Sequence, residues 1–203
     1  MKHEEFLRRV REATGRAPEA PVPPPPEPVR PSAPAEAREL VERFVREHEA
    51  VLGRAHVTAT PSEAREVLTG LLHGAATFVR SPHVLLDELG LAEVTRDLSP
   101  AAPAEADVGV TVAAFGVAAT GSVAFESAWG RLAALLPDRH VTVLRASTLV
   151  PDVADAYLLL DPARLPGAWG FHTGPSKSAD IEQTMALGVH GPGRVDVIVL
   201  ANE

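Results

Sequence analysis

Residues 194–200 read RVDVIVL, a short apolar run rich in valine that is typical of a buried β-strand. Other strand-like runs occur at 56–60 (HVTAT), 76–80 (ATFVR), 107–112 (DVGVTV), 122–127 (SVAFES) and 140–146 (HVTVLRA). Helical patterns or glycine turns separate these runs. Near-continuous apolar strands that alternate with helices are typical of a parallel sheet covered on both faces. The sequence therefore predicts an α/β protein with a mostly parallel sheet.

The segments between the strands carry helix signals. Residues 35–52 place apolar side chains at helical spacing, namely Leu40, Val41, Phe44, Val45 and Val51. A second helix is expected directly after the strand at 56–60. Thr60 can cap that helix, Pro61 suits its first turn, and Glu63 can complete a capping box. Another helix is expected to start near Ser81.

The first 34 residues have a different character. Residues 1–16 predict a short amphipathic helix, and residues 17–34 contain nine of the chain's 19 prolines. Such a proline-rich segment favours an extended polyproline II conformation, so we interpret it as a linker. Residues 35–203 form the predicted α/β domain. The first helix is either a tail that does not contribute to the core or a tethered docking helix.

Composition limits the possible functions. A net charge of −8 and a pI near 5.5 argue against a nucleic-acid binder, which needs a basic face. The chain has no cysteine, so it can hold neither a disulfide nor a cysteine-ligated iron-sulfur cluster. The uncharged run 108–125 is broken by glycines and small polar residues, which predicts strand-turn-strand and not a membrane helix. The expected location is cytoplasmic, because no secretion signal is recognisable.

One candidate binding segment is VAATGSVAF at 117–125, a tight turn between two buried strands. The hydroxyls of Thr120 and Ser122, and the backbone around Gly121, are placed to face a ligand. The alternative is a plain β-turn with no binding role.

The second candidate segment is GPSKSADIE at 174–182. The Gly-Pro turn ends a strand, and Ser176 or Ser178 is expected to cap a helix. The apolar face of this helix would consist of Ile181, Met185 and Val189. Free amides of the first turn, two hydroxyls and Lys177 would then form an anion pocket. The alternative is simple helix capping with a surface lysine.

Other types of site fit this segment poorly. No glycine directly precedes Lys177, so the spacing is not that of a Walker A loop. His172 and His190 flank the segment without a metal-ligand spacing, and no metal site is expected. The predicted ligand-binding residues are Thr120, Gly121, Ser122, Gly174, Ser176, Lys177, Ser178, Asp180 and Glu182.

Residues 174–200, GPSKSADIEQTMALGVHGPGRVDVIVL, resemble the C-terminal signature of the LUD-domain family, specifically its lactate utilisation C type. The segments ADVGVTVAAFGVAATGS and LPDRHVTVLRASTLVPDVADAY also follow that family, so the resemblance covers roughly 106–200. Residues 35–105 fit its order of helices and strands more loosely.

The resemblance implies a three-layer α/β/α fold similar to that of sugar-phosphate isomerases and CoA transferases. It also implies a non-redox subunit of a system that oxidises L-lactate to pyruvate, with a small anionic ligand and no cofactor in this chain. Iron-sulfur clusters are then expected on partner subunits. One alternative is a stand-alone enzyme acting on a phosphorylated or CoA-linked organic acid. Another is an interaction subunit with a degenerate site.

Two positions depart from the family pattern. Ala114 stands where relatives usually have an aspartate, and Ala119 stands where they usually have a glutamate. If that glutamate transfers protons or orients the ligand, this chain has lost the step and kept binding or assembly. We expect Ala119 to face the ligand cavity.

Overall fold

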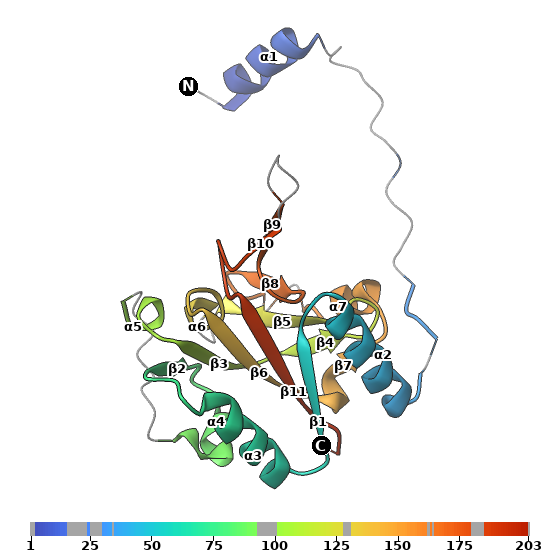
Figure 1. Ribbon diagram of the computed structural model, residues 1–203. Helices are drawn as coiled ribbons and strands as arrows, with labels where there is room; N and C mark the ends of the chain where they lie inside the picture. The colour runs from blue at the N-terminus through green and yellow to red at the C-terminus, as the bar shows by residue number, and fades with distance from the viewer. Residues whose placement is uncertain are drawn as a thin grey trace.

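The central sheet of the computed structural model has five parallel strands (Figure 1). The structure describes residues 3–15, 24, 30–33, 35–92, 101–127, 131–161, 163, 165–179 and 185–202. The strands of the central sheet, in spatial order, are β1 (Arg54–Thr58), β11 (Arg194–Leu200), β6 (Arg139–Arg145), β3 (Val108–Val112) and β2 (Phe78–Arg80). The last strand in sequence thus lies inside the sheet, between β1 and β6, and β11 pairs with β6 over its full length.

A second, four-stranded sheet was not distinguished by the sequence, which indicated a single mostly parallel sheet. Its strands, in spatial order, are β7 (Leu149–Val150), β4 (Phe115–Val117), β5 (Ser122–Glu126) and β8 (Trp169–His172). The β4–β5 and β5–β8 pairs are antiparallel. A separate antiparallel hairpin joins β9 (Lys177–Ala179) to β10 (Met185–Leu187).

Helices and short helical turns connect the strands. They are α1 (His3–Thr14), α2 (Ala37–Ala50), α3 (Pro61–Leu72), α4 (Val84–Leu86), η1 (Asp87–Leu91), α5 (Ala101–Ala104), α6 (Arg131–Leu135), η3 (Ala146–Thr148) and α7 (Val153–Leu158). The predicted cap of α3 is confirmed: Thr60 Oγ1 accepts from the Glu63 N–H at 3.2 Å. The Glu63 carboxylate accepts in return from the N–H of Ala59, one residue before the cap, at 2.8 Å.

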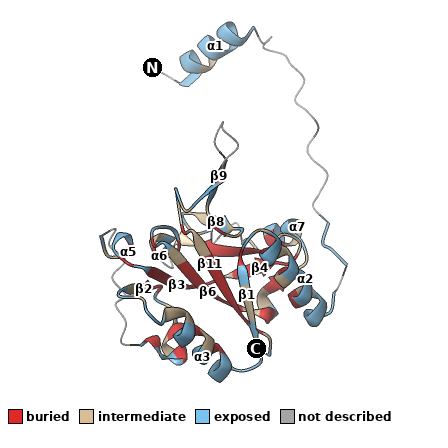
Figure 2. Cartoon of the chain, in the orientation of Figure 1, coloured by how far each residue is buried: buried red, intermediate tan, exposed pale blue. Residues whose placement is uncertain are grey.

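The central sheet is covered on both faces, which confirms the three-layer α/β/α arrangement. One face packs against α3, α4 and η1 through a cluster that includes Leu68, Leu85 and Ile198. The opposite face packs against α2 and β5, with Phe44 and Val197 in the contact. Buried residues accordingly concentrate in the central strands and in the layers that touch them (Figure 2). The second sheet shares its layer with α2, and this layer positions the candidate site.

The predicted N-terminal helix is present as α1, and none of its residues is buried. The backbone N–H of Ser32 donates to Asp155 Oδ1 at 2.8 Å, an exposed contact. We predict that deleting residues 1–34 changes the free energy of unfolding by less than about 1 kcal/mol, because α1 has no buried residue and exposed hydrogen bonds such as that of Ser32 contribute little. Thermal unfolding of the full and shortened chains measures this. A large drop in Tm would place the segment in the core.

Candidate functional site

The two predicted binding segments are connected by a chain of hydroxyl groups. Thr120 lies in the turn between β4 and β5, and Ser122 begins β5. Their side-chain oxygens lie 2.7 Å apart, and Ser122 Oγ lies 2.7 Å from Thr173 Oγ1. Thr173 directly precedes Gly174. The structure therefore brings together segments that lie about 50 residues apart in sequence, although Ser122 reaches the second segment through Thr173, a residue that sequence reasoning missed.

Gly121 has a structural role in this arrangement. Its φ is +62°, and a Cβ at this position would lie 2.2 Å from the backbone nitrogen of His48. The Gly121 carbonyl also accepts a 2.8 Å hydrogen bond from Nδ1 of the buried His48. The turn thus contacts helix α2 at van der Waals range, and only glycine fits there.

The prediction of a helix after Gly174 is wrong. Residues 177–179 form β9, which pairs with β10, and Met185 lies in a strand and not on a helix face. The backbone continues this pairing before β9: Ser176 N–H donates to Pro192 O, and its carbonyl accepts from Gly188 N–H, each at 2.9 Å. The N–H of Ser176, one of the backbone groups that we expected to be free for an anion, is therefore occupied by a cross-strand hydrogen bond.

Two more of the predicted residues lie on strand β9 of this hairpin. Lys177 is exposed on β9, and Ser178 is half-buried opposite Ala186. Because there is no helix start here, neither Ser176 nor Ser178 is a helix cap. Asp180 and Glu182 lie outside the described residues.

A cavity of about 190 Å³ lies at the start of the second segment. Its lining includes Gly174 and Ser176 from the predicted set, together with His172, Thr173 and His190. The apolar part of the lining comes from Leu135, Phe171 and Pro192. The described lining residues carry no acidic side chain. The cavity therefore offers hydroxyl and imidazole groups to a small polar ligand.

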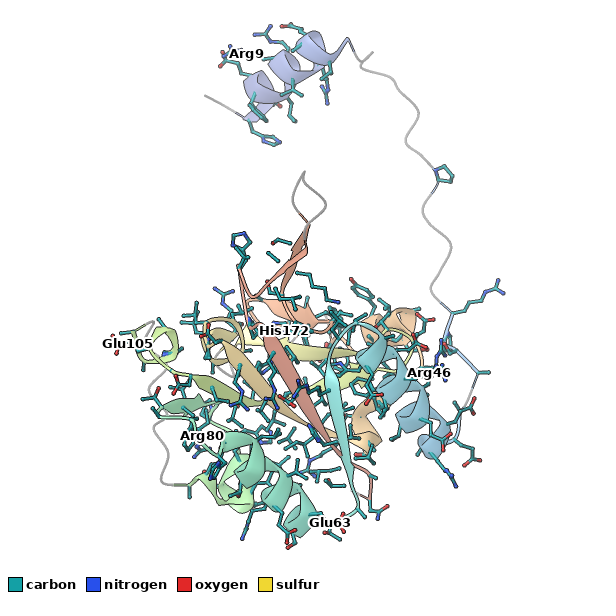
Figure 3. The ribbon with its side chains drawn as sticks, in the orientation of Figure 1. Arg9, Arg46, Glu63, Arg80, Glu105 and His172 are labelled. Atoms are coloured by element: carbon teal, nitrogen blue, oxygen red, sulfur yellow. The ribbon has the colours of Figure 1, made fainter. Side chains whose placement is uncertain are left out.

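His172 is half-buried at the end of β8 and contacts a buried group of aromatic and polar side chains; Figure 3 labels its position. Its ring contacts Phe125 and His140, with centroids 4.9 and 5.6 Å apart. His140 is fully buried, and its Nε2 lies 2.8 Å from Thr111 Oγ1. The Thr111 hydroxyl is also 3.1 Å from Thr142 Oγ1. Thr111, His140 and Thr142 thus place polar groups among the buried apolar side chains of β3 and β6.

Burial sets the charge of these imidazoles. It lowers the pKa of His140 well below the usual value, and the neighbouring His172 lowers it further. Burial likewise lowers the pKa of His172. Both rings are therefore neutral at neutral pH, and His140 uses its Nε2 in the hydrogen bond with Thr111. Sequence reasoning missed His140, although a histidine at the start of a valine-rich strand was a visible signal.

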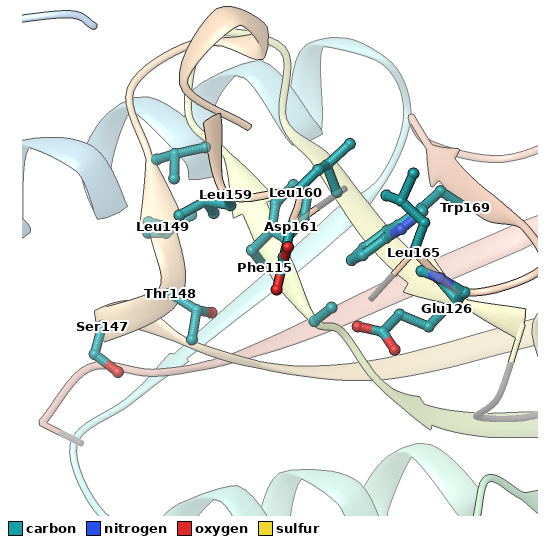
Figure 4. Close-up of a pocket in the computed structure, with 13 residues that line it drawn as sticks. Phe115, Glu126, Ser147, Thr148, Leu149, Leu159, Leu160, Asp161, Leu165 and Trp169 are labelled. Carbon is teal, nitrogen blue, oxygen red and sulfur yellow. The ribbon is translucent and has the colours of Figure 1, made fainter. Parts of the chain in front are cut away.

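The two alanines that depart from the family pattern occupy different surroundings. Ala114 lines a larger cavity of about 470 Å³, which Figure 4 shows with the carboxylates of Glu126 and Asp161. Ala119 is half-buried and packs against an apolar cluster that includes Phe115 and Val117. Ala114 packs against the same cluster, but Ala119 lines neither the 470 Å³ nor the 190 Å³ cavity, so its expected position facing the ligand stays a prediction. The described lining of the 470 Å³ cavity contains acidic but no basic side chains, which disfavours an anionic ligand there.

Comparison with known proteins identifies the family. Residues 101–200 match the family model described as the LUD domain, so the chain contains a LUD domain and the predicted family is confirmed. The lactate utilization protein C of Halalkalibacterium halodurans is 41% identical over 103 residues, and that of Anoxybacillus flavithermus is 29% identical over 168 residues. Escherichia coli YkgG is 35% identical over 147 residues.

The matched regions cover different shares of these proteins. The alignment spans 47% of this chain and 45% of the Halalkalibacterium protein, so it covers less than half of that relative. The alignment with the Anoxybacillus protein spans 73% of this chain and 76% of that protein. The alignment with YkgG spans 63% of this chain and 64% of YkgG.

A solved structure supports the fold. The crystal structure of a DUF162-family protein from Deinococcus radiodurans superposes with a TM-score of 0.60. It is 24% identical, and the superposition covers 82% of this chain and 99% of that one. Within the described residues, no helix is long and apolar enough to cross a membrane.

Proposed function

We propose that this chain acts in L-lactate utilisation as a LUD-domain subunit without a redox centre of its own. The proposal is supported by the likeness to proteins named lactate utilization protein C and by the LUD-domain match over residues 101–200, which includes both candidate binding segments. Its ligand is a small organic acid held in the 190 Å³ cavity. The iron-sulfur clusters that pass on the electrons belong to partner subunits.

The observation that carries the proposal is the chemistry of this cavity. The hydroxyls of Thr173 and Ser176 and the imidazoles of His172 and His190 are groups that donate hydrogen bonds to a carboxylate. The volume is below the roughly 300–1,000 Å³ of pockets for drug-sized ligands, so it suits an acid of few atoms. The 470 Å³ cavity, which is lined by Glu126 and Asp161, would repel such an acid.

The role of partner subunits follows from the residue types of this chain. Oxidation of lactate to pyruvate releases two electrons and two protons, and a second component must accept the electrons. The chain has no cysteine, so it cannot ligate an iron-sulfur cluster through thiolates. Its own residues bind and orient the acid, and the electrons leave through a partner. We place the assembly in the cytoplasm.

Removal of the gene from its organism tests the proposal. We expect growth on L-lactate as the only carbon source to be lost and growth on pyruvate to be retained, because the block lies before pyruvate. Reintroduced wild-type chain restores growth. Equal growth of the deletion strain and the parent on L-lactate would contradict the proposal.

The binding site is tested by complementation with Thr173→Val. This change removes a hydroxyl that lies 2.7 Å from Ser122 and lines the cavity, at nearly constant volume. We expect it to restore growth poorly and to weaken L-lactate binding by about tenfold, the effect of one hydrogen bond to a charged group. Thr69→Val is the control, because Thr69 is exposed on α3 and its hydroxyl donates to Arg65 O of the same helix. Equal complementation by both variants would remove Thr173 from the site.

A further inference from the structure

The 190 Å³ cavity adjoins a second cavity of about 300 Å³ between β8 and α6. The two cavities share Leu135, Phe171 and His172 in their linings. His172 therefore stands at the junction between them. A ligand that contacts His172 from the smaller cavity has the larger cavity directly beside it.

The alternation of side chains along β8 indicates which of them turn toward the 300 Å³ cavity. Side chains alternate between the two faces of a strand, and Trp169 and Phe171 contact Phe115 on one face. Gly170 and His172 belong to the other face, where His172 meets Phe125. Gly170 pairs directly with Phe125, and a Cβ built at Gly170 has no atom within 4 Å. The open space of the cavity thus lies where the Gly170 side chain would be.

The lining of the 300 Å³ cavity is mostly apolar and includes the cation of Arg131, which is exposed on α6. Its apolar lining includes Phe125, Ala134 and Leu135, and its hydroxyl comes from Ser127. Among the described lining residues, Arg131 carries the only full charge. A guanidinium beside an apolar channel is suited to a carboxylate at the end of a hydrocarbon chain, which it can hold with two parallel hydrogen bonds.

We propose that the two cavities form one elongated site for a 2-hydroxy dicarboxylic acid. One carboxylate and the hydroxyl lie among Thr173, Ser176 and His172, and the second carboxylate reaches Arg131 through the apolar cavity. The inference rests on the anion site proposed above and extends it from a three-carbon acid to a longer dianionic one. The extension is carried by the junction at His172 and by the charge of Arg131.

Titration of the full chain with three acids tests the inference. The probes are L-lactate, L-2-hydroxyglutarate and L-2-hydroxyvalerate, and the last two have equal chain lengths but differ by one carboxylate. We expect 2-hydroxyglutarate to bind at least about tenfold more tightly than the other two, as expected for one additional charged hydrogen-bonded pair. Equal affinities for 2-hydroxyglutarate and 2-hydroxyvalerate would overturn the inference.

Two variants locate the second carboxylate. Arg131→Gln should remove the preference for 2-hydroxyglutarate and leave L-lactate binding within about twofold. The reason is that Arg131 is assigned to the second carboxylate, which L-lactate lacks. Gly170→Leu should have the same effect by filling the larger cavity, and its melting curve reports whether it folds. Arg38→Gln is the control, since Arg38 is exposed on α2 and pairs with Glu42. Loss of lactate binding in Arg131→Gln would overturn the assignment.

The outcomes also separate this inference from the proposed function. Lactate-dependent growth without any preference for the dicarboxylate would overturn the elongated site alone. Tight binding of 2-hydroxyglutarate in a chain whose deletion leaves growth on L-lactate unchanged would overturn the proposed function alone. Failure of all three acids to bind would overturn the shared anion site, and with it both proposals.

Discussion

Gly121→Ala is expected to leave little folded protein. The added Cβ would lie 2.2 Å from the His48 backbone nitrogen and 2.6 Å from the Glu47 carbonyl carbon, and neither atom can move without shifting helix α2. The residue would also keep a φ of +62°, which strains an alanine. We expect the free energy of unfolding to fall by more than about 4 kcal/mol, a large part of the roughly 5–15 kcal/mol typical of a domain.

The same substitution at Gly70 provides the control. Gly70 lies inside α3, and a Cβ there has no atom outside the helix's own backbone within 4 Å. Gly70→Ala should therefore raise the free energy of unfolding by about 0.5–1 kcal/mol through helix propensity. Denaturant unfolding followed by circular dichroism measures both variants. A soluble Gly121→Ala protein with wild-type stability would show that the turn does not contact α2 as described.

Acidification is expected to destabilise the fold well above the range in which carboxylates titrate. Burial is the main cause that lowers the pKa of His48, His140 and His172 in the folded chain. Each of them favours the neutral, folded state at a pH above the usual imidazole value of about 6.5. As the pH falls through that value, the unfolded chain binds protons that the folded chain does not, and stability is lost.

The size of this effect follows from linkage. Each histidine can contribute at most about 1.4 kcal/mol per pH unit below the usual imidazole value, so we expect the free energy of unfolding to fall between pH 7 and pH 5. His140→Gln should reduce this pH dependence, because glutamine retains a hydrogen-bonding group and does not titrate. His73→Gln is the control at an exposed histidine. A pH dependence that is identical in wild type and His140→Gln would contradict the role assigned to His140.

The strands and the fold class were predictable because valine-rich runs and the Thr60 cap are local signals. The second sheet was not, because a strand such as β5 has the same apolar pattern whichever sheet it joins. The spacing of Ile181, Met185 and Val189 indicated a helix, but the backbone of Ser176 bonds to Pro192 and Gly188 from the other side of the hairpin. Such non-local pairing leaves no mark on local periodicity.

Prediction of the candidate site was limited by the same difference between local and non-local information. Gly174 and Ser176 do line the cavity, whereas Gly121 is explained by the close approach of α2. Thr173 and His172 were not predicted to bind a ligand, because their place depends on how β8 pairs with β5. A turn that must accommodate a crossing helix and a turn that binds a ligand both select small residues, so the sequence pattern is the same.

The position of β11 has a consequence for how this protein is made. The strand formed by residues 194–200 lies between β1 and β6, and neither of these neighbours pairs with the other. During synthesis the central sheet therefore remains in two parts until residues 194–200 have been translated. The strand edge of β6 that β11 later covers stays unpaired through that period, so the growing chain is prone to aggregation until residues 194–200 are in place.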